Sequence, residues 1–144
     1  MQKMYLPSVA DAVAAIPVME SAIVASESAG TDITDQFLGM VGGAVAIGSI
    51  YIVPVSAGLT ASDTLYVTFT INKQTAAAGD VAIGSVVTKV TGGSGSWTKW
   101  VPVSCTVVAG ATLAANDTLF VSTVHASTGT ATPTFQVCIF PAQS

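Results

Sequence analysis

His125 is the only histidine in this chain of 144 residues, and histidine is the side chain that most readily exchanges protons near neutral pH. A catalytic histidine acts together with a nucleophile and an orienting carboxylate. The sequence shows no Ser-His-Asp or Cys-His order around His125. We therefore interpret His125 as a strand-end or surface residue, and we predict no catalytic residue.

Cys105 and Cys138 are the only cysteines, and each lies in an apolar segment with no CxxC motif. A zinc site needs about four ligands, which one histidine and two separated cysteines do not supply. The pattern favours buried free thiols, with a disulfide between two strands as the alternative. The sequence predicts no metal and no cofactor.

Asp63 and Asp117 occupy equivalent positions in a repeated phrase, LTASDTLYV (59–67) and LAANDTLFV (113–121). A calcium site takes about six to eight oxygen ligands, usually from clustered acids, whereas these aspartates are accompanied only by Ser62 or Asn116 and by threonines. Such side chains accept backbone N–H groups in turns. We predict that both aspartates are structural turn residues.

Charge is scarce along the whole chain. Charged residues make up 8% of it, against about 25% in an ordinary soluble protein, and the net charge is −4. Four lysines and no arginine provide no basic patch for nucleic acid. A membrane-spanning helix needs about 20 consecutive apolar residues, and acids, Pro17 and glycines interrupt every candidate stretch. We expect neither a nucleic-acid partner nor a membrane.

From about residue 43 onward, short apolar runs alternate with turns rich in Gly, Asn, Asp and Ser. LYVTFTI (65–71) and VPVSCTVV (101–108) alternate with period two, and Pro102 favours an edge position for the second. Further strands are expected at 44–55, 81–90, 118–125 and 134–140. The repeated phrase predicts two three-strand units packed face to face, giving an all-β antiparallel sandwich of jelly-roll type over residues 36–144.

Residues 1–35 have a different texture, being rich in alanine, serine and valine and in acidic residues. Pro17 and the β-branched residues disfavour a long helix. We predict an N-terminal arm, extended or with a short helix. Deleting residues 1 to about 30 is expected to leave the sandwich folded.

Trp97 and Trp100 lie three positions apart, so on a strand they face opposite sides and only one enters the core easily. The positions opposite the predicted core carry threonine and serine instead of lysine or glutamate. Such sheets lack the charges that prevent sheets from sticking to one another. The pattern predicts a protein that works inside an assembly, through charge-poor interfaces.

LTASDTLYVTFTINK, GSGSWTKW and LAANDTLFVSTVHASTGTATPTFQVCI make residues 45–140 resemble the capsid decoration, or cement, proteins of tailed bacteriophages. The resemblance implies a structural homo-oligomer, most often a homotrimer, that sits on the outer surface of the virion and bridges neighbouring major capsid proteins after assembly in the host bacterial cytoplasm. It brings no catalytic residues. The candidate partner-binding residues are Tyr5, Leu6, Ile16, Val18, Trp97 and Trp100.

Two other classes of function stay open. A phage fibre or receptor-binding module would stack sugars on exposed aromatic residues, for which the candidates are Tyr51, Tyr66, Trp97 and Trp100. A hydrolase would need a carboxylate pair, and the sparse acids nominate none.

Overall fold

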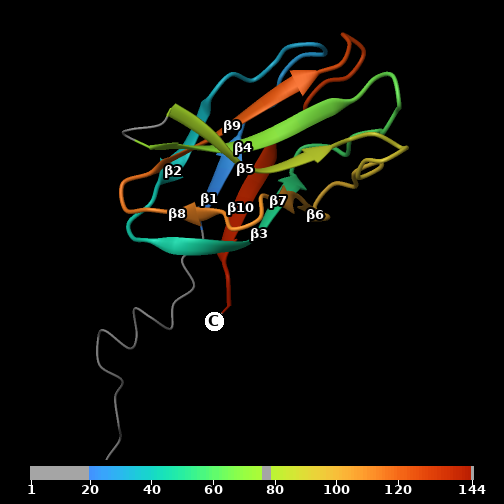
Figure 1. Ribbon diagram of the computed structural model, residues 1–144. Coiled ribbons are helices and arrows are strands. Elements are labelled where there is room, and N and C mark those ends of the chain that lie inside the picture. The colour runs from blue at the N-terminus through green and yellow to red at the C-terminus, as the bar shows by residue number, and fades with distance from the viewer. Residues whose placement is uncertain (1–19, 76–78, 144) are drawn as a thin grey trace, which may run out of the picture.

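The computed structural model describes residues 20–75 and 79–143, which form two antiparallel sheets packed face to face (Figure 1). The first sheet has the order β1-β10-β3-β6, with β8 also paired to β3, and the second has the order β2-β9-β4-β5-β7. Their bounds are β1 Glu20–Val24, β3 Val45–Pro54, β6 Val103–Ser104, β8 Thr112–Leu113 and β10 Phe135–Pro141; β2 Gln36–Met40, β4 Val67–Thr75, β5 Gly79–Val87, β7 Thr106–Val107 and β9 Thr118–His125. The predicted all-β antiparallel sandwich is confirmed. Over the described ranges no helix has the length and hydrophobicity to span a bilayer.

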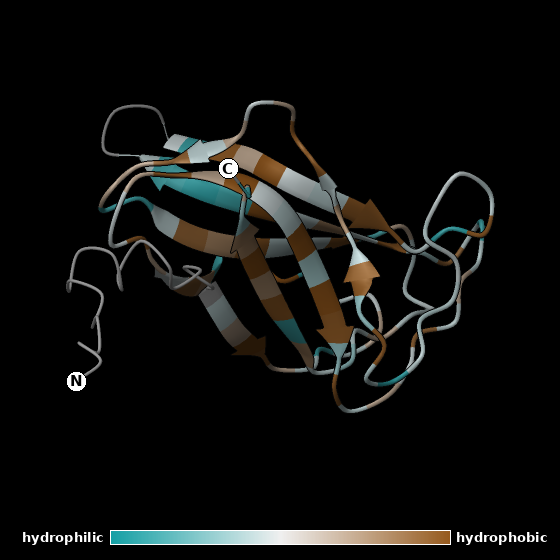
Figure 2. Ribbon diagram, turned by 90° about the horizontal axis from the view of Figure 1, so that it is seen from below, coloured by the Kyte–Doolittle hydropathy of each residue, from teal (hydrophilic) through white to brown (hydrophobic). Residues whose placement is uncertain are grey.

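The long strands form because apolar and polar residues alternate along them. In β4, Val67, Phe69 and Ile71 are fully buried, while Thr68 and Thr70 lie on the opposite face. Figure 2 shows this alternation as brown and pale bands along the strands. β-Branched and aromatic residues pack well on a pleated surface, and each large side chain buried in this way contributes about 1.5–3 kcal/mol.

Aromatic rings fill the centre of the core. The Phe69 ring lies 4.8 Å from the Trp97 ring and 5.2 Å from the Phe135 ring, measured between centroids. Trp97 is buried, and its indole N–H donates to Ser94 Oγ at 2.7 Å, so its polar atom is satisfied. Trp97 is therefore a core residue, and the prediction that it binds a partner at the surface is wrong.

The two copies of the repeated phrase are arranged differently from the prediction. β4 follows the first copy, β9 lies in the second, and these two strands pair with each other in one sheet, with Val67 opposite His125 and Lys73 opposite Leu119. β3 pairs in the same manner with β6. The repeated units therefore do not form one sheet each, because corresponding strands of the two units join through backbone hydrogen bonds. The leucine that opens each copy, Leu59 or Leu113, is buried.

The segment Val101–Val108 also differs from a single strand. It forms two short strands, β6 in one sheet and β7 in the other, and buried Cys105 lies between them with its N–H donating to Ile50 O at 2.9 Å. Both short strands lie at sheet edges, as Pro102 indicates. The chain therefore changes sheets at Cys105.

Residues 20–35 belong to the sandwich. β1 pairs with β10 along its whole length, from Glu20 opposite Ile139 to Val24 opposite Phe135, and Val24 and Ile33 are buried in the core. The expected boundary between arm and sandwich at residue 35 therefore moves toward the N-terminus. The rest of the expected arm, including Tyr5, Leu6, Ile16 and Val18, lies outside the described residues.

Candidate interaction surface

His125 ends β9 and joins two loops through its ring. The ring Nδ1 lies 3.0 Å from Asp32 Oδ1, and Nε2 lies 3.1 Å from Thr132 Oγ1. The backbone N–H of His125 also donates to Asp32 Oδ1 at 2.7 Å. This backbone hydrogen bond, followed by the bond to the ring, holds the pKa of Asp32 below its ordinary value of 3.8. The strand-end position agrees with the sequence, but the His125 side chain is 2% exposed.

Carboxylate, imidazole and hydroxyl occur here in the order used by nucleophilic hydrolases. A nucleophile must be open to a substrate carbon, however, and Thr132 is 1% exposed. Its backbone is also fixed by the reciprocal hydrogen bonds between Glu27 and Thr132, at 3.0 and 3.2 Å. The Asp32–His125–Thr132 cluster therefore joins the end of β9 to two loops, and its hydroxyl is shielded from solvent.

Metal-binding residues are dispersed in the part of the chain that the structure describes. No group of three or more His, Cys, Asp or Glu side chains gathers in residues 20–75 and 79–143. Cys105 and Cys138 are both free, Cys105 being buried and Cys138 partly exposed. Burial raises the pKa of the Cys105 thiol to about 12, so this thiol stays protonated and unreactive.

Asp63 and Asp117 hold different partners. Asp117 is buried, accepts the Ala114 N–H at 2.9 Å within its own turn, and pairs with the Lys73 amine at 3.6 Å. Asp63 is exposed and accepts both the N–H and the hydroxyl of Thr91, at 2.7 and 2.8 Å. These bonds, the backbone one first, lower the pKa of Asp63. Ser62 Oγ accepts the N–H groups within the first turn, so Asp63 is free to tie that turn to a distant loop.

The outer faces of both sheets are almost without charge. On the β2-β9-β4-β5-β7 sheet, the register places Thr70, Ser85 and Ser122 side by side on the outer face. Lys73 lies opposite buried Leu119 and therefore belongs to the inner face of the sheet. Among the described strand residues, this leaves Asp80, at the β4–β5 hairpin, as the charged residue on the outer face. On the other sheet, the outer positions of β3 and β10 are Ser49, Tyr51, Val53, Gln136, Cys138 and Phe140.

Apolar side chains are exposed where both sheets end on the same side of the sandwich. Ile23 of β1, and Phe37 and Met40 of β2, are 68%, 54% and 57% exposed. The Phe37 ring meets the half-buried ring of Phe120 on β9 at 5.9 Å between centroids. β1 and β2 are edge strands, with one neighbouring strand each. Phe37, Met40 and Phe120 lie on neighbouring strands and on one outer face, and we call these three residues the edge patch.

Trp100 is exposed, unlike Trp97. It is 60% exposed, its φ is 66°, and its N–H donates to Pro54 O at 2.8 Å. A positive φ is rare for a bulky residue and costs about 1–3 kcal/mol. The Lys99 amine lies 5.6 Å from the centre of the Trp100 ring. As their spacing predicts, one tryptophan enters the core and the other is exposed. A turn, and not the alternation of a strand, places them on different sides.

A shallow groove of about 520 Å³ lies on the outer face of the first sheet. Tyr51 and Phe140 line it, with their rings 6.0 Å apart in an edge-to-face arrangement, together with Ser49 and Gln143. Of the other aromatic residues considered for sugar stacking, Trp97 is buried and the Tyr66 ring has the Lys89 amine at 4.1 Å. Tyr51, which lines the groove, and exposed Trp100 therefore remain the candidates for ligand contact.

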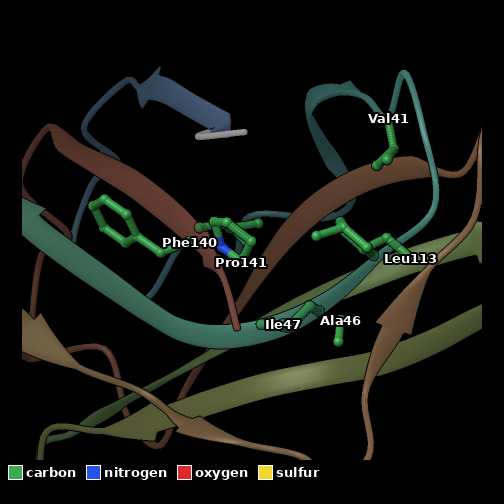
Figure 3. A pocket seen from close by; sticks show the side chains of 8 residues that line it. Val41, Ala46, Ile47, Leu113, Phe140 and Pro141 are labelled. Carbon is green, nitrogen blue, oxygen red and sulfur yellow. The ribbon is translucent and has the colours of Figure 1, made fainter. Parts of the chain in front are cut away.

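A second, smaller pocket lies at the end of the sandwich where β1 begins (Figure 3). It is apolar and is lined by Val41, Val45, Ala46, Ile47, Leu113, Ile139, Phe140 and Pro141. Its volume is about 10 Å³, the room of roughly one water molecule. This is far below the 300–1,000 Å³ or so of ligand sites, so the pocket fits no cofactor.

No protein-family model matches the chain, and comparisons with curated proteins and with solved structures give no match either.

Proposed function

We propose that this protein is a structural component of a tailed-bacteriophage head, binding the outside of the capsid as a homotrimer and clamping neighbouring major capsid proteins. The observation that carries the proposal is the near absence of charge on both outer faces of the sandwich, combined with the exposed edge patch. A free protein with such faces associates. Sister chains and a shell would cover them.

The strand order supports the same proposal. β1, β10, β3 and β6 in one sheet, with β2, β9, β4 and β5 in the other, is the order expected of a jelly roll with two Greek keys. Viral capsid proteins and lectins use this architecture. Exposed and backbone-strained Trp100 is a second contact candidate, because large aromatic residues concentrate binding energy at interfaces.

Many weak identical contacts are sufficient for such a clamp. When one oligomer engages several capsid sites, each later contact forms within the complex, and the affinities combine by avidity. The chain therefore needs no strong single site. The resemblance of residues 45–140 to capsid decoration proteins is what selects a phage head among possible assemblies.

Light scattering of the purified full chain tests the self-association. We expect a homotrimer at micromolar concentration, and we expect the double variant Phe37→Ser and Met40→Ser to reduce the mass. Val90→Ser, which changes an exposed valine outside the edge patch, is the matched control. A stable monomer of the native chain would contradict the proposed trimer.

Electron cryomicroscopy of heads with and without the protein tests the capsid contact. Heads that lack the protein should bind added chain at regular positions between capsid subunits, and Trp100→Ala should reduce this occupancy if Trp100 is a contact. Binding to no site on the shell would remove the capsid proposal and leave only an assembly-forming protein.

A glycan-binding module of a phage fibre is the second candidate, and the Tyr51–Phe140 groove favours it. The groove combines two aromatic rings with polar Ser49 and Gln143, the mixture that sugar-binding sites use. Retention of the native chain on a glycan surface, lost on Tyr51→Ala with folding intact, would favour this function over the capsid clamp.

A further inference from the structure

We propose that the Tyr51–Phe140 groove binds uncharged hexose units, with one sugar ring stacked on Tyr51, and that it excludes sugars that carry a carboxylate. The inference rests on glycan binding, the second candidate function above, and it names the class of sugar that this site selects. Three features of the groove carry it: the arrangement of the two rings, the free polar groups beside them, and the absence of charge from the lining.

Two aromatic rings form the apolar part of the groove. Tyr51 on β3 and Phe140 on β10 lie on the outer face of neighbouring strands, with ring centroids 6.0 Å apart and ring planes at 77°. This edge-to-face contact is favourable and orients both rings before a ligand arrives. Both residues are only partly buried. A hexose presents a face of C–H groups, which packs on an aromatic ring and leaves the hydroxyl groups at its rim.

A β-bulge shapes the wall of the groove. The register of β10 with β3 shifts here, and Gly48 is the extra residue on β3. A Cβ atom at Gly48 would lie 2.6 Å from Pro141 O, so only glycine lets the two strands approach in this way. The Ala142 N–H donates to Ala46 O at 2.8 Å, which fixes the segment after Pro141 against β3. Bulges of this kind often accompany binding sites.

Polar groups beside the rings are free to meet the hydroxyl groups of a sugar. Ser49 and Gln143 line the groove together with Tyr51. Within residues 20–75 and 79–143, the hydroxyl groups of Ser49 and Tyr51 and the side-chain amide of Gln143 have no hydrogen-bond partner. Each of these three groups can both donate and accept. They therefore match sugar hydroxyl groups, which also do both.

The lining of the groove is uncharged. Among the described lysines, Lys73 pairs with Asp117, while Lys89 and Lys99 lie beside aromatic rings that do not line the groove. A carboxylate bound here would lose water without gaining a cation, and the net charge of −4 would oppose its approach. A neutral hexose meets neither cost. The groove therefore favours neutral sugars over sialic or uronic acids.

Retention of the purified full chain on sugar-coated surfaces tests this selection. Surfaces that carry glucose, galactose or mannose oligosaccharides are compared with matched surfaces that carry sialic acid or glucuronic acid. We expect retention on at least one neutral surface to exceed retention on every acidic surface. Equal or stronger retention on an acidic surface, or no retention on any neutral surface, would overturn the proposal.

Two alanine variants locate the site on the chain. Tyr51→Ala should lower retention on the neutral surface roughly tenfold, whereas Trp100→Ala, which removes an exposed aromatic ring outside the groove, should leave it unchanged. Circular dichroism and light scattering check that both variants keep the fold and the mass of the native chain, so that a loss of avidity is not mistaken for a loss of contact. The reverse pattern would place the site at Trp100 and overturn the assignment.

A gain of function tests the role of charge. Gln143→Lys adds a cation at an exposed position of the groove. We expect this variant to be retained on acidic surfaces at low salt and released as the salt concentration rises. Retention as low as that of the native chain would show that charge does not set the selection, and the proposed exclusion of acidic sugars would be wrong.

The outcomes separate this inference from the functions on which it builds. Retention on acidic surfaces alone would keep glycan binding as a function and overturn the neutral-sugar selection. Retention on no surface would remove both, while the trimer measured by light scattering and the binding to phage heads would stand or fall by themselves.

Discussion

Asp117 Oδ2 lies 3.6 Å from the Lys73 amine, which ties the turn of the second repeat to the strand that follows the first. Lys73 also donates to Thr112 O, on β8. The two repeats are thus joined at this end of the sandwich by an ion pair whose side chains are 17% and 6% exposed. The repeated sequence therefore stabilises the fold through contacts between its copies.

Replacing Asp117 with alanine should lower the free energy of unfolding by about 1–3 kcal/mol, because the Ala114 N–H loses its acceptor and Lys73 loses its buried counter-charge. Urea denaturation measures the change. Asp80→Ala is the control, since Asp80 is exposed at a hairpin, and it should change stability little. Equal effects at the two positions would contradict the role of Asp117.

Stability should fall at acid pH through Asp32 and Asp63. Their pKa values in the folded protein lie below 3.8, so each carboxylate stabilises the fold fully above about pH 4 and loses this contribution as the pH falls through its folded value. Asp32→Asn and Asp63→Asn should each lower Tm at neutral pH. Near pH 2 the Tm of each variant should approach the Tm of the native chain. Parallel Tm curves for native and variant chains down to that pH would contradict the assignment.

The Asp32–His125–Thr132 cluster should act on stability. Thr132→Val keeps the shape of the side chain but leaves the His125 ring nitrogen without its hydroxyl partner, at a cost of about 1–3 kcal/mol. Thr134→Val, at a partly exposed position two residues away, is the matched control. A Thr132→Val chain as stable as the native one would show that the bond contributes nothing.

The sequence predicts the long strands well because their burial alternates strictly. The range expected at 118–125 is that of β9, and β3, β4, β5 and β10 lie within a few residues of their predicted positions. β1 and β2 are missed for a physical reason. In β1 the largest apolar side chain, Ile23, points outward, and in β2 both Phe37 and Met40 are exposed, so the apolar residues of these edge strands do not mark the core face.

The polar cluster could not be found from the sequence. Asp32, His125 and Thr132 come from separate loops and a strand end, and no local spacing relates Asp32 to His125. The pairing of β4 with β9 likewise depends on which strands meet in three dimensions. A repeat in the sequence predicts equivalent local structure, as the buried Leu59 and Leu113 illustrate, but it does not determine whether the copies face each other or join edge to edge.

Deleting residues 1–30 should unfold or strongly destabilise the sandwich, in contrast to the expectation from sequence. The deletion removes β1, and with it buried Val24 and all the backbone hydrogen bonds on one side of β10. Unpaired strand edges and exposed core residues favour aggregation. Circular dichroism and binding of a hydrophobic dye measure the loss of structure. Deletion of residues 1–15, which leaves β1 intact, is the control and should keep a cooperative thermal transition. A folded chain after removal of residues 1–30 would mean that β1 contributes little to the core.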